Sequence, residues 1–115
     1  MWLPLAGLLL GVVVGLVSSV SVPADYARYT GIAILAALDS LLGAIAAELH
    51  GEYRNDVFLI GLGSNMLLAG GLTYLGDRLG VELYFAAIVA FGSRLFSNLA
   101  TIRRELIDRI RIVQP

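Results

Sequence analysis

Three polar residues lie near the centres of apolar stretches, where side chains of their types are rare and functionally informative. Asp39, Asn65 and Arg94 each fall in the middle of a different, mostly apolar run. A lone charge at the centre of a bilayer costs about 2.5 to 3.5 kcal/mol even on the most lenient insertion scale. We therefore expect an Asp39–Arg94 ion pair inside a helical bundle, with Asn65 and Asn98 supplying further hydrogen-bonding groups.

This intramembrane polar cluster has two interpretations. Buried polar side chains can act as structural contacts that fix which membrane helices pack together and in which register. They can also mark a transport path or a proton relay. Because Arg94 is well placed to neutralise Asp39, we favour the structural role, and transport stays open as the alternative.

The apolar runs that position these residues make up most of the chain. Of the 115 residues, 58% are hydrophobic and 15% are charged, whereas about a quarter of the residues in soluble domains are charged. A run of about twenty apolar residues is long enough to cross the hydrocarbon core as a helix. We predict an all-α integral membrane protein. Residues 1–102 would form a bundle of four transmembrane helices, at about residues 3–22, 31–49, 57–75 and 83–102, and residues 103–115 an amphipathic cytoplasmic tail.

The first run contains a ridge of glycines at four-residue spacing, Gly7, Gly11 and Gly15. Such a ridge lets another helix backbone approach closely, and Gly43 on the second run lies on a similar stripe of small residues. The partner of the ridge is either another span of this chain or a second copy. A secretory signal peptide is a rival interpretation of the run, but no Arg or Lys precedes it and it is long for such a segment.

The arginines predict the orientation of the chain in the membrane. Each of the three loops between the runs contains one arginine, whereas the tail contains four: Arg103, Arg104, Arg109 and Arg111. The positive-inside rule places such a tail in the cytoplasm, and an even number of spans places the amino terminus there too. We therefore expect a multi-pass protein of the plasma membrane.

Several classes of function are disfavoured by composition. The formal net charge is −1, which gives no electrostatic reason to bind nucleic acid, and there is no cysteine. Glu48, His50 and Glu52 could be drawn as a metal site, but residues two apart do not share a helix face. Asp39–Ser40 has no base nearby that could activate the hydroxyl. We expect no metal, no cofactor and no enzymatic activity.

Several segments carry a resemblance to a known family. They are residues 1–5, Met-Trp-Leu-Pro-Leu, with the glycine-rich run that follows; residues 35–40, which include Asp39; Ser64–Asn65; and residues 74–84 and 91–104. In these segments the chain resembles the small basic protein family of Gram-positive bacteria. The resemblance implies a membrane protein that is usually encoded in the division and cell-wall gene cluster and has no assigned reaction. This chain departs from the family name, because it is slightly acidic.

Together these features predict a small plasma-membrane scaffold or assembly protein, and the resemblance implies a link to cell division or envelope biogenesis. We expect its partners to be the lipid bilayer and either further copies of the chain or other membrane proteins, bound through the glycine ridge and the tail. The alternative is a small oligomeric transporter or channel that uses the polar cluster. Small multidrug exporters have a similar length, but their essential carboxylate lies in the first span, which has none here.

Overall fold

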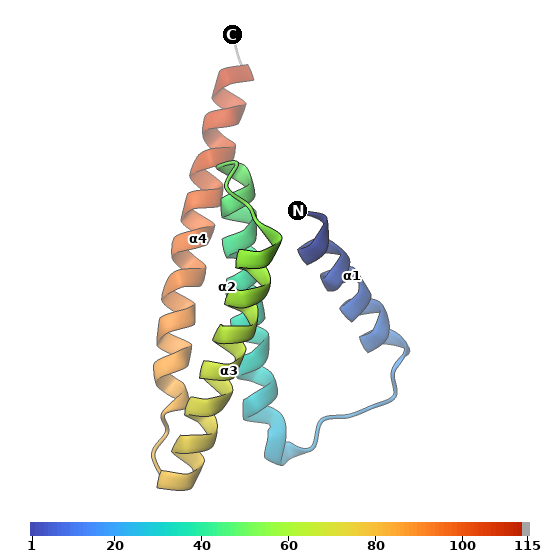
Figure 1. Ribbon diagram of the computed structural model, residues 1–115, viewed down its shortest axis with the longest axis vertical. Helices are drawn as coiled ribbons and strands as arrows, with labels where there is room; N and C mark the ends of the chain where they lie inside the picture. Colours follow the sequence, from blue (N-terminus) through green and yellow to red (C-terminus); the bar gives the residue numbers. More distant parts are fainter. Residues whose placement is uncertain (114–115) are drawn as a thin grey trace.

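The computed structural model describes residues 1–113, which form four α-helices and one short 3-10 helix and contain no strand (Figure 1). The predicted all-helical class is confirmed. Gln114 and Pro115, the last two residues of the predicted tail, lie outside the described part of the chain. The elements are α1 (Trp2–Val17), η1 (Ala24–Tyr26), α2 (Ala27–Leu49), α3 (Asn55–Leu79) and α4 (Tyr84–Val113).

Helices α2, α3 and α4 form a three-helix unit with α2 at its centre (Figure 1). Helix α2 packs along both α3 and α4, whereas α3 and α4 touch each other much less. Helix α3 is antiparallel to both α2 and α4 (Figure 1). Helices α2 and α4 therefore point in the same direction. The core is small and is built around Ala36, Ala69 and Ala87, with Ile32 and Phe91 completing it. Small side chains at these contacts allow the helix axes to approach closely.

The three helices of this unit are long and apolar enough to cross a membrane, over Ala24–Leu49, Asn55–Leu79 and Tyr84–Arg111. Their large apolar side chains mostly point away from the core. Leu67, Val89 and Phe96 are each at least 70% exposed. An apolar exterior of this extent would aggregate in water, whereas it is what a lipid-facing surface requires. Three of the four predicted spans are therefore confirmed as helices that are long and apolar enough to cross a membrane.

Helix α1 is shorter than its predicted span. Its 16 residues extend about 24 Å, less than the roughly 30 Å of a hydrocarbon core. The apolar run continues to Val22, but the helix ends at Val17, and Ser18 is already extended. Alternating serine and valine residues favour helix poorly, and Pro23 disfavours helical backbone in the residue before it.

Helix α1 also stands largely apart from the three-helix unit (Figure 1). Only its beginning is anchored: the amino group of Met1 lies 3.8 Å from Glu48 at the end of α2, and Pro4 is buried. Most other side chains of α1 are exposed.

Glycines make the sharp turn between α3 and α4. Gly80 ends α3 in the left-handed conformation, with φ of +71°, and the amide of Val81 donates to the carbonyl of Gly76 at 3.0 Å. This arrangement closes a helix end by satisfying its free carbonyl groups. Gly76 has no room for a side chain, because a Cβ there would collide with the backbone of Val81 and lie 2.9 Å from the nitrogen of Leu83.

Candidate functional site

The structure brings the three intramembrane polar residues together around Asp39. The Asp39 side chain on α2 is fully buried. Its Oδ2 atom lies 3.5 Å from Nη1 of Arg94 on α4, and 3.5 Å from Nδ2 of Asn65 on α3. Asn65 also donates to the hydroxyl of Ser40, at 3.5 Å. One carboxylate thus receives polar groups from both helices that flank α2.

This cluster lies at the middle of the membrane helices. At 1.5 Å per residue, Asp39 is about 16 Å along α2 from Arg28 and about 16 Å from His50. Half of a hydrocarbon core is about 15 Å thick. A bilayer that covers the apolar part of α2 therefore places Asp39 at its midplane, where charges interact strongly and leaving one unpaired is costly.

The two charges of the cluster differ in their environment. Asp39 is sealed from the exterior, whereas the side chain of Arg94 is 58% exposed. The second carboxylate oxygen of Asp39, Oδ1, is buried and has no hydrogen-bond partner within residues 1–113. A guanidinium has five N–H donors, so most of those of Arg94 are available to an acceptor outside this chain. The cluster is therefore an ion pair in which the carboxylate is enclosed and the guanidinium is accessible from outside the three helices.

The remaining small and polar residues of the prediction lie one turn further along the same contact. A Cβ atom placed on Gly43 of α2 would lie 3.5 Å from Nδ2 of Asn98 on α4. That separation is ordinary van der Waals contact. Asn98 therefore lies against the small-residue stripe of α2, and Gly43 leaves space for its amide.

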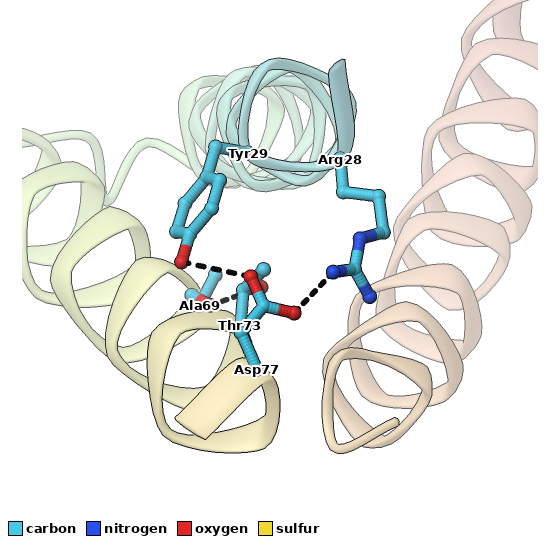
Figure 2. A network of polar contacts seen from close by, with 5 residues as sticks. All are labelled: Arg28, Tyr29, Ala69, Thr73 and Asp77. Carbon is cyan, nitrogen blue, oxygen red and sulfur yellow. Dashed lines mark hydrogen bonds and ion pairs between the residues drawn. The ribbon is translucent and has the colours of Figure 1, made fainter. Parts of the chain in front are cut away.

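A second polar network closes one end of the three-helix unit (Figure 2). Arg28 and Tyr29 reach from the start of α2 towards Asp77 on α3. Arg28 forms an ion pair with Asp77, and the Tyr29 hydroxyl donates to Oδ2 of Asp77 at 3.2 Å. The guanidinium of Arg28 also lies 5.2 Å from the ring centroid of Tyr84, at the start of α4. One turn before Asp77, Thr73 donates to the carbonyl of Ala69 at 2.9 Å. The network joins all three helices.

Comparison with known proteins places the chain in a family. A family model described as "Protein of unknown function (DUF1290)" matches residues 22–107. The Small basic protein of Bacillus subtilis is 50% identical over 109 residues, which cover 95% of this chain and 90% of that protein. The chain belongs to the DUF1290 family. The resemblance to the small basic protein family is thereby confirmed.

More distant relatives of this DUF1290 protein are also found. Uncharacterized proteins of Mycobacterium tuberculosis and Mycobacterium bovis are each 40% identical over 104 residues, covering 89% of this chain and 86% of theirs. No solved structure matches. The region matched by the DUF1290 model begins after α1 and ends within α4. It therefore covers α2, α3 and most of α4 and contains both polar networks.

The structure leaves the glycine ridge of α1 uncovered. Nothing lies within 4 Å of a Cβ atom placed on Gly7, Gly11 or Gly15. No other described part of the chain uses these glycines for close helix packing. The ridge is a free face of α1.

The basic tail begins as a straight continuation of α4, with Arg103 and Arg104 exposed on its surface. Arg109 reaches back to the end of α2, where Nη2 donates to the carbonyl of Leu49 at 2.8 Å, and its Nε lies 3.9 Å from Glu105. An arginine in this position satisfies a free carbonyl and complements the helix dipole. Arg111 lies in the last turn of α4. The first part of the tail is thus a helical extension of α4 that contacts the end of α2 through Arg109.

Sequence reasoning missed the Arg28–Asp77 network, and a signal for it was present. Arg28 and Asp77 lie in the first and third connections between apolar runs, and these two connections lie on the same side of a membrane in any up-and-down bundle. Opposite charges in such a pair of connections are candidates for contact. The sequence does not show which of these charges meet. Asp77 is followed directly by Arg78, and the spacing alone does not distinguish the two as neighbours of Arg28.

Proposed function

We propose that this DUF1290 protein is a small plasma-membrane scaffold or assembly protein. The observation that carries the proposal is the environment of Asp39, whose carboxylate is fully buried and receives polar groups from α3 and α4. Such a carboxylate holds three helices in one register. The exteriors of these helices then remain free for lipid and for partner helices.

The placement of the two chain ends supports an orientation with both termini in the cytoplasm. The start of α1 and the far end of α4 lie at the same end of the molecule (Figure 1). That end carries five arginines, at positions 54, 103, 104, 109 and 111, and the opposite end carries Arg28 and Arg78. The positive-inside rule assigns the richer end to the cytoplasm.

Reporter fusions test this orientation. A cytoplasmic reporter fused after Pro115 is expected to be active, and a tag inserted between residues 77 and 82 is expected to react with an impermeant reagent in intact cells. A tag that is protected in intact cells but reacts after permeabilisation would show that the orientation is reversed.

Two surfaces are available for assembly. The glycine ridge of α1 fits a closely packed helix, either in a second copy or in another membrane protein, and α4 presents the exposed side chains of Leu106 and Ile110. The family resemblance points to partners of the division or envelope machinery.

The second candidate function is a small oligomeric transporter or channel. Two observations favour it: the exposure of Arg94 and the unpartnered Oδ1 atom of Asp39. A polar group open to one side at mid-membrane is what a hydrated path requires.

Flux measurements distinguish the two candidates. The purified protein is reconstituted into liposomes, and proton and ion fluxes are compared with those of empty liposomes and of the Asp39→Asn variant. A scaffold is expected to give no flux above that of empty liposomes. Flux that requires Asp39 would replace the scaffold by the transporter.

A further inference from the structure

The end of the molecule that carries the Arg28–Asp77 network also contains an open cavity that none of the predicted functions uses. Its volume is about 540 Å³. The cavity lies between η1, the first turn of α2 and the last turns of α3, and six residues line it: Asp25, Tyr26, Tyr29, Tyr74, Asp77 and Arg78.

The depth of the cavity places it among lipid headgroups. Asp77 is about 18 Å along α3 from Asn65 at the midplane, slightly more than half of a hydrocarbon core of about 30 Å. Tyrosine rings are enriched at this depth because they have an apolar body and a polar tip, and half of the lining residues are tyrosines. A ligand of this cavity therefore meets it at the boundary between acyl chains and headgroups.

The cavity lining contains an oriented cation, the guanidinium of Arg78. Nε of Arg78 donates to the hydroxyl of Tyr74 at 3.1 Å, and its guanidinium carbon lies 5.5 Å from the centroid of the same ring. These contacts use Nε and leave the terminal nitrogens without a partner among residues 1–113. Such an oriented guanidinium is well suited to binding a phosphate.

The cavity lining also contains two carboxylates, Asp25 and Asp77. Asp77 is already engaged by Arg28 and Tyr29, whereas Asp25 on η1 is exposed and forms no ion pair within the described chain. Tyr26 and Tyr29 also line the cavity, and the face of an aromatic ring can attract a cation. Among the cavity-lining residues together with Arg28, two aspartates face two arginines, so these four charges balance.

We propose that this cavity binds the headgroup of a zwitterionic phospholipid that has a primary ammonium group, such as phosphatidylethanolamine. The phosphate contacts Arg78, and the ammonium contacts Asp25 and the neighbouring tyrosine faces. A primary ammonium donates hydrogen bonds to a carboxylate, which a choline group cannot do. A purely anionic headgroup leaves Asp25 unpaired. The proposal does not depend on the scaffold function.

Lipid binding to the purified full chain tests the proposal. Protein in detergent is titrated separately with phosphatidylethanolamine, phosphatidylcholine and phosphatidylglycerol of identical acyl chains, and native mass spectrometry measures the bound fraction. We expect phosphatidylethanolamine to bind most tightly. Arg78→Gln is expected to weaken its binding about tenfold, the equivalent of one charge-assisted hydrogen bond. Asp25→Asn is expected to weaken the binding of phosphatidylethanolamine and leave that of phosphatidylcholine unchanged.

Matched variants at the opposite end of the molecule serve as controls. Arg54→Gln and Glu52→Gln remove the same charges outside the cavity and are expected to leave all three affinities unchanged. Tyr74→Phe removes the hydroxyl that orients Arg78 while keeping the charge, and is expected to give an intermediate loss. Circular dichroism verifies that each variant is folded.

Three results would overturn the proposal. They are equal affinity for the three lipids, a loss in the control variants as large as in Arg78→Gln, and binding of soluble glycerophosphoethanolamine or inorganic phosphate as tight as that of the lipid. The last result would show a site for a free phosphate compound instead of a membrane lipid.

Discussion

Arg94 on α4 approaches within 3.5 Å of Asp39 on α2, yet only the carboxylate is buried and more than half of the guanidinium side chain is exposed. The two partners of this pair therefore depend on each other unequally. Asp39 has no route to another cation, because it is enclosed by the packed helices. Arg94 has a long, flexible side chain that can move its charge part of the way towards the membrane surface, which lowers the cost of losing its partner.

Single substitutions in this pair are expected to have unequal effects. Arg94→Ala leaves a buried carboxylate without a counter-charge and is expected to destabilise the protein by about 3 kcal/mol. Asp39→Ala is expected to cost about 1 to 2 kcal/mol, within the range of polar contacts between membrane helices. The double variant should lose less than the sum of the two. Thermal unfolding in a mild detergent measures these losses, and strictly additive effects would show that the side chains are not coupled.

Gly76 is the position at which a single methyl group is most damaging. The backbone of Val81 and Leu83 occupies the space that a Cβ atom would need, and backbone atoms cannot move away cheaply. Gly76→Ala is expected to destabilise the protein by about 2 to 3 kcal/mol through overpacking of the α3–α4 turn. Gly71→Ala on the same helix is the matched control, since nothing lies within 4 Å of its Cβ position. The control is expected to be neutral or slightly stabilising, and equal thermal shifts in both variants would contradict this account of the turn.

The glycine ridge of α1 is expected to affect association and to leave the fold of a single chain intact. Gly11→Leu fills a face that no described part of the chain contacts, so its thermal stability as a monomer should match that of the wild type. Its self-association, measured by cross-linking in liposomes or by energy transfer between labelled copies, should decrease. Unchanged association would mean that the ridge faces only lipid.

Arg109 is expected to hold the end of α2 in place. Its substitution by alanine removes a charged donor from the Leu49 carbonyl and should cost about 1 kcal/mol. Amide hydrogen exchange in the last turn of α2 should become faster. Arg104→Ala removes an equal charge from an exposed position of the same helix and should leave that exchange unchanged. If both variants accelerate exchange equally, the effect comes from charge near the membrane surface and not from the hydrogen bond.

The sequence by itself determined the class of this protein, because the relevant signals are local. Long apolar runs separated by short polar turns require helices that satisfy their own backbone groups in lipid. The cost of a charge in hydrocarbon was enough to predict that Asp39, Asn65 and Arg94 meet. The arginine bias along the chain was likewise readable without a structure, although the orientation it predicts awaits its test.

The tertiary structure decided which faces meet and which remain open, because these depend on how helices pack in three dimensions. Periodicity could not show that Asp39 is enclosed while Arg94 is exposed, since burial is a property of the neighbouring helices. It could not show that the glycine ridge of α1 has no partner within the described chain. The contact of Arg28 with Asp77, residues 49 positions apart, arises from the return of α3 beside α2. The sequence places both residues in connections on the same side of the bundle, but it does not show which of the charges there make contact.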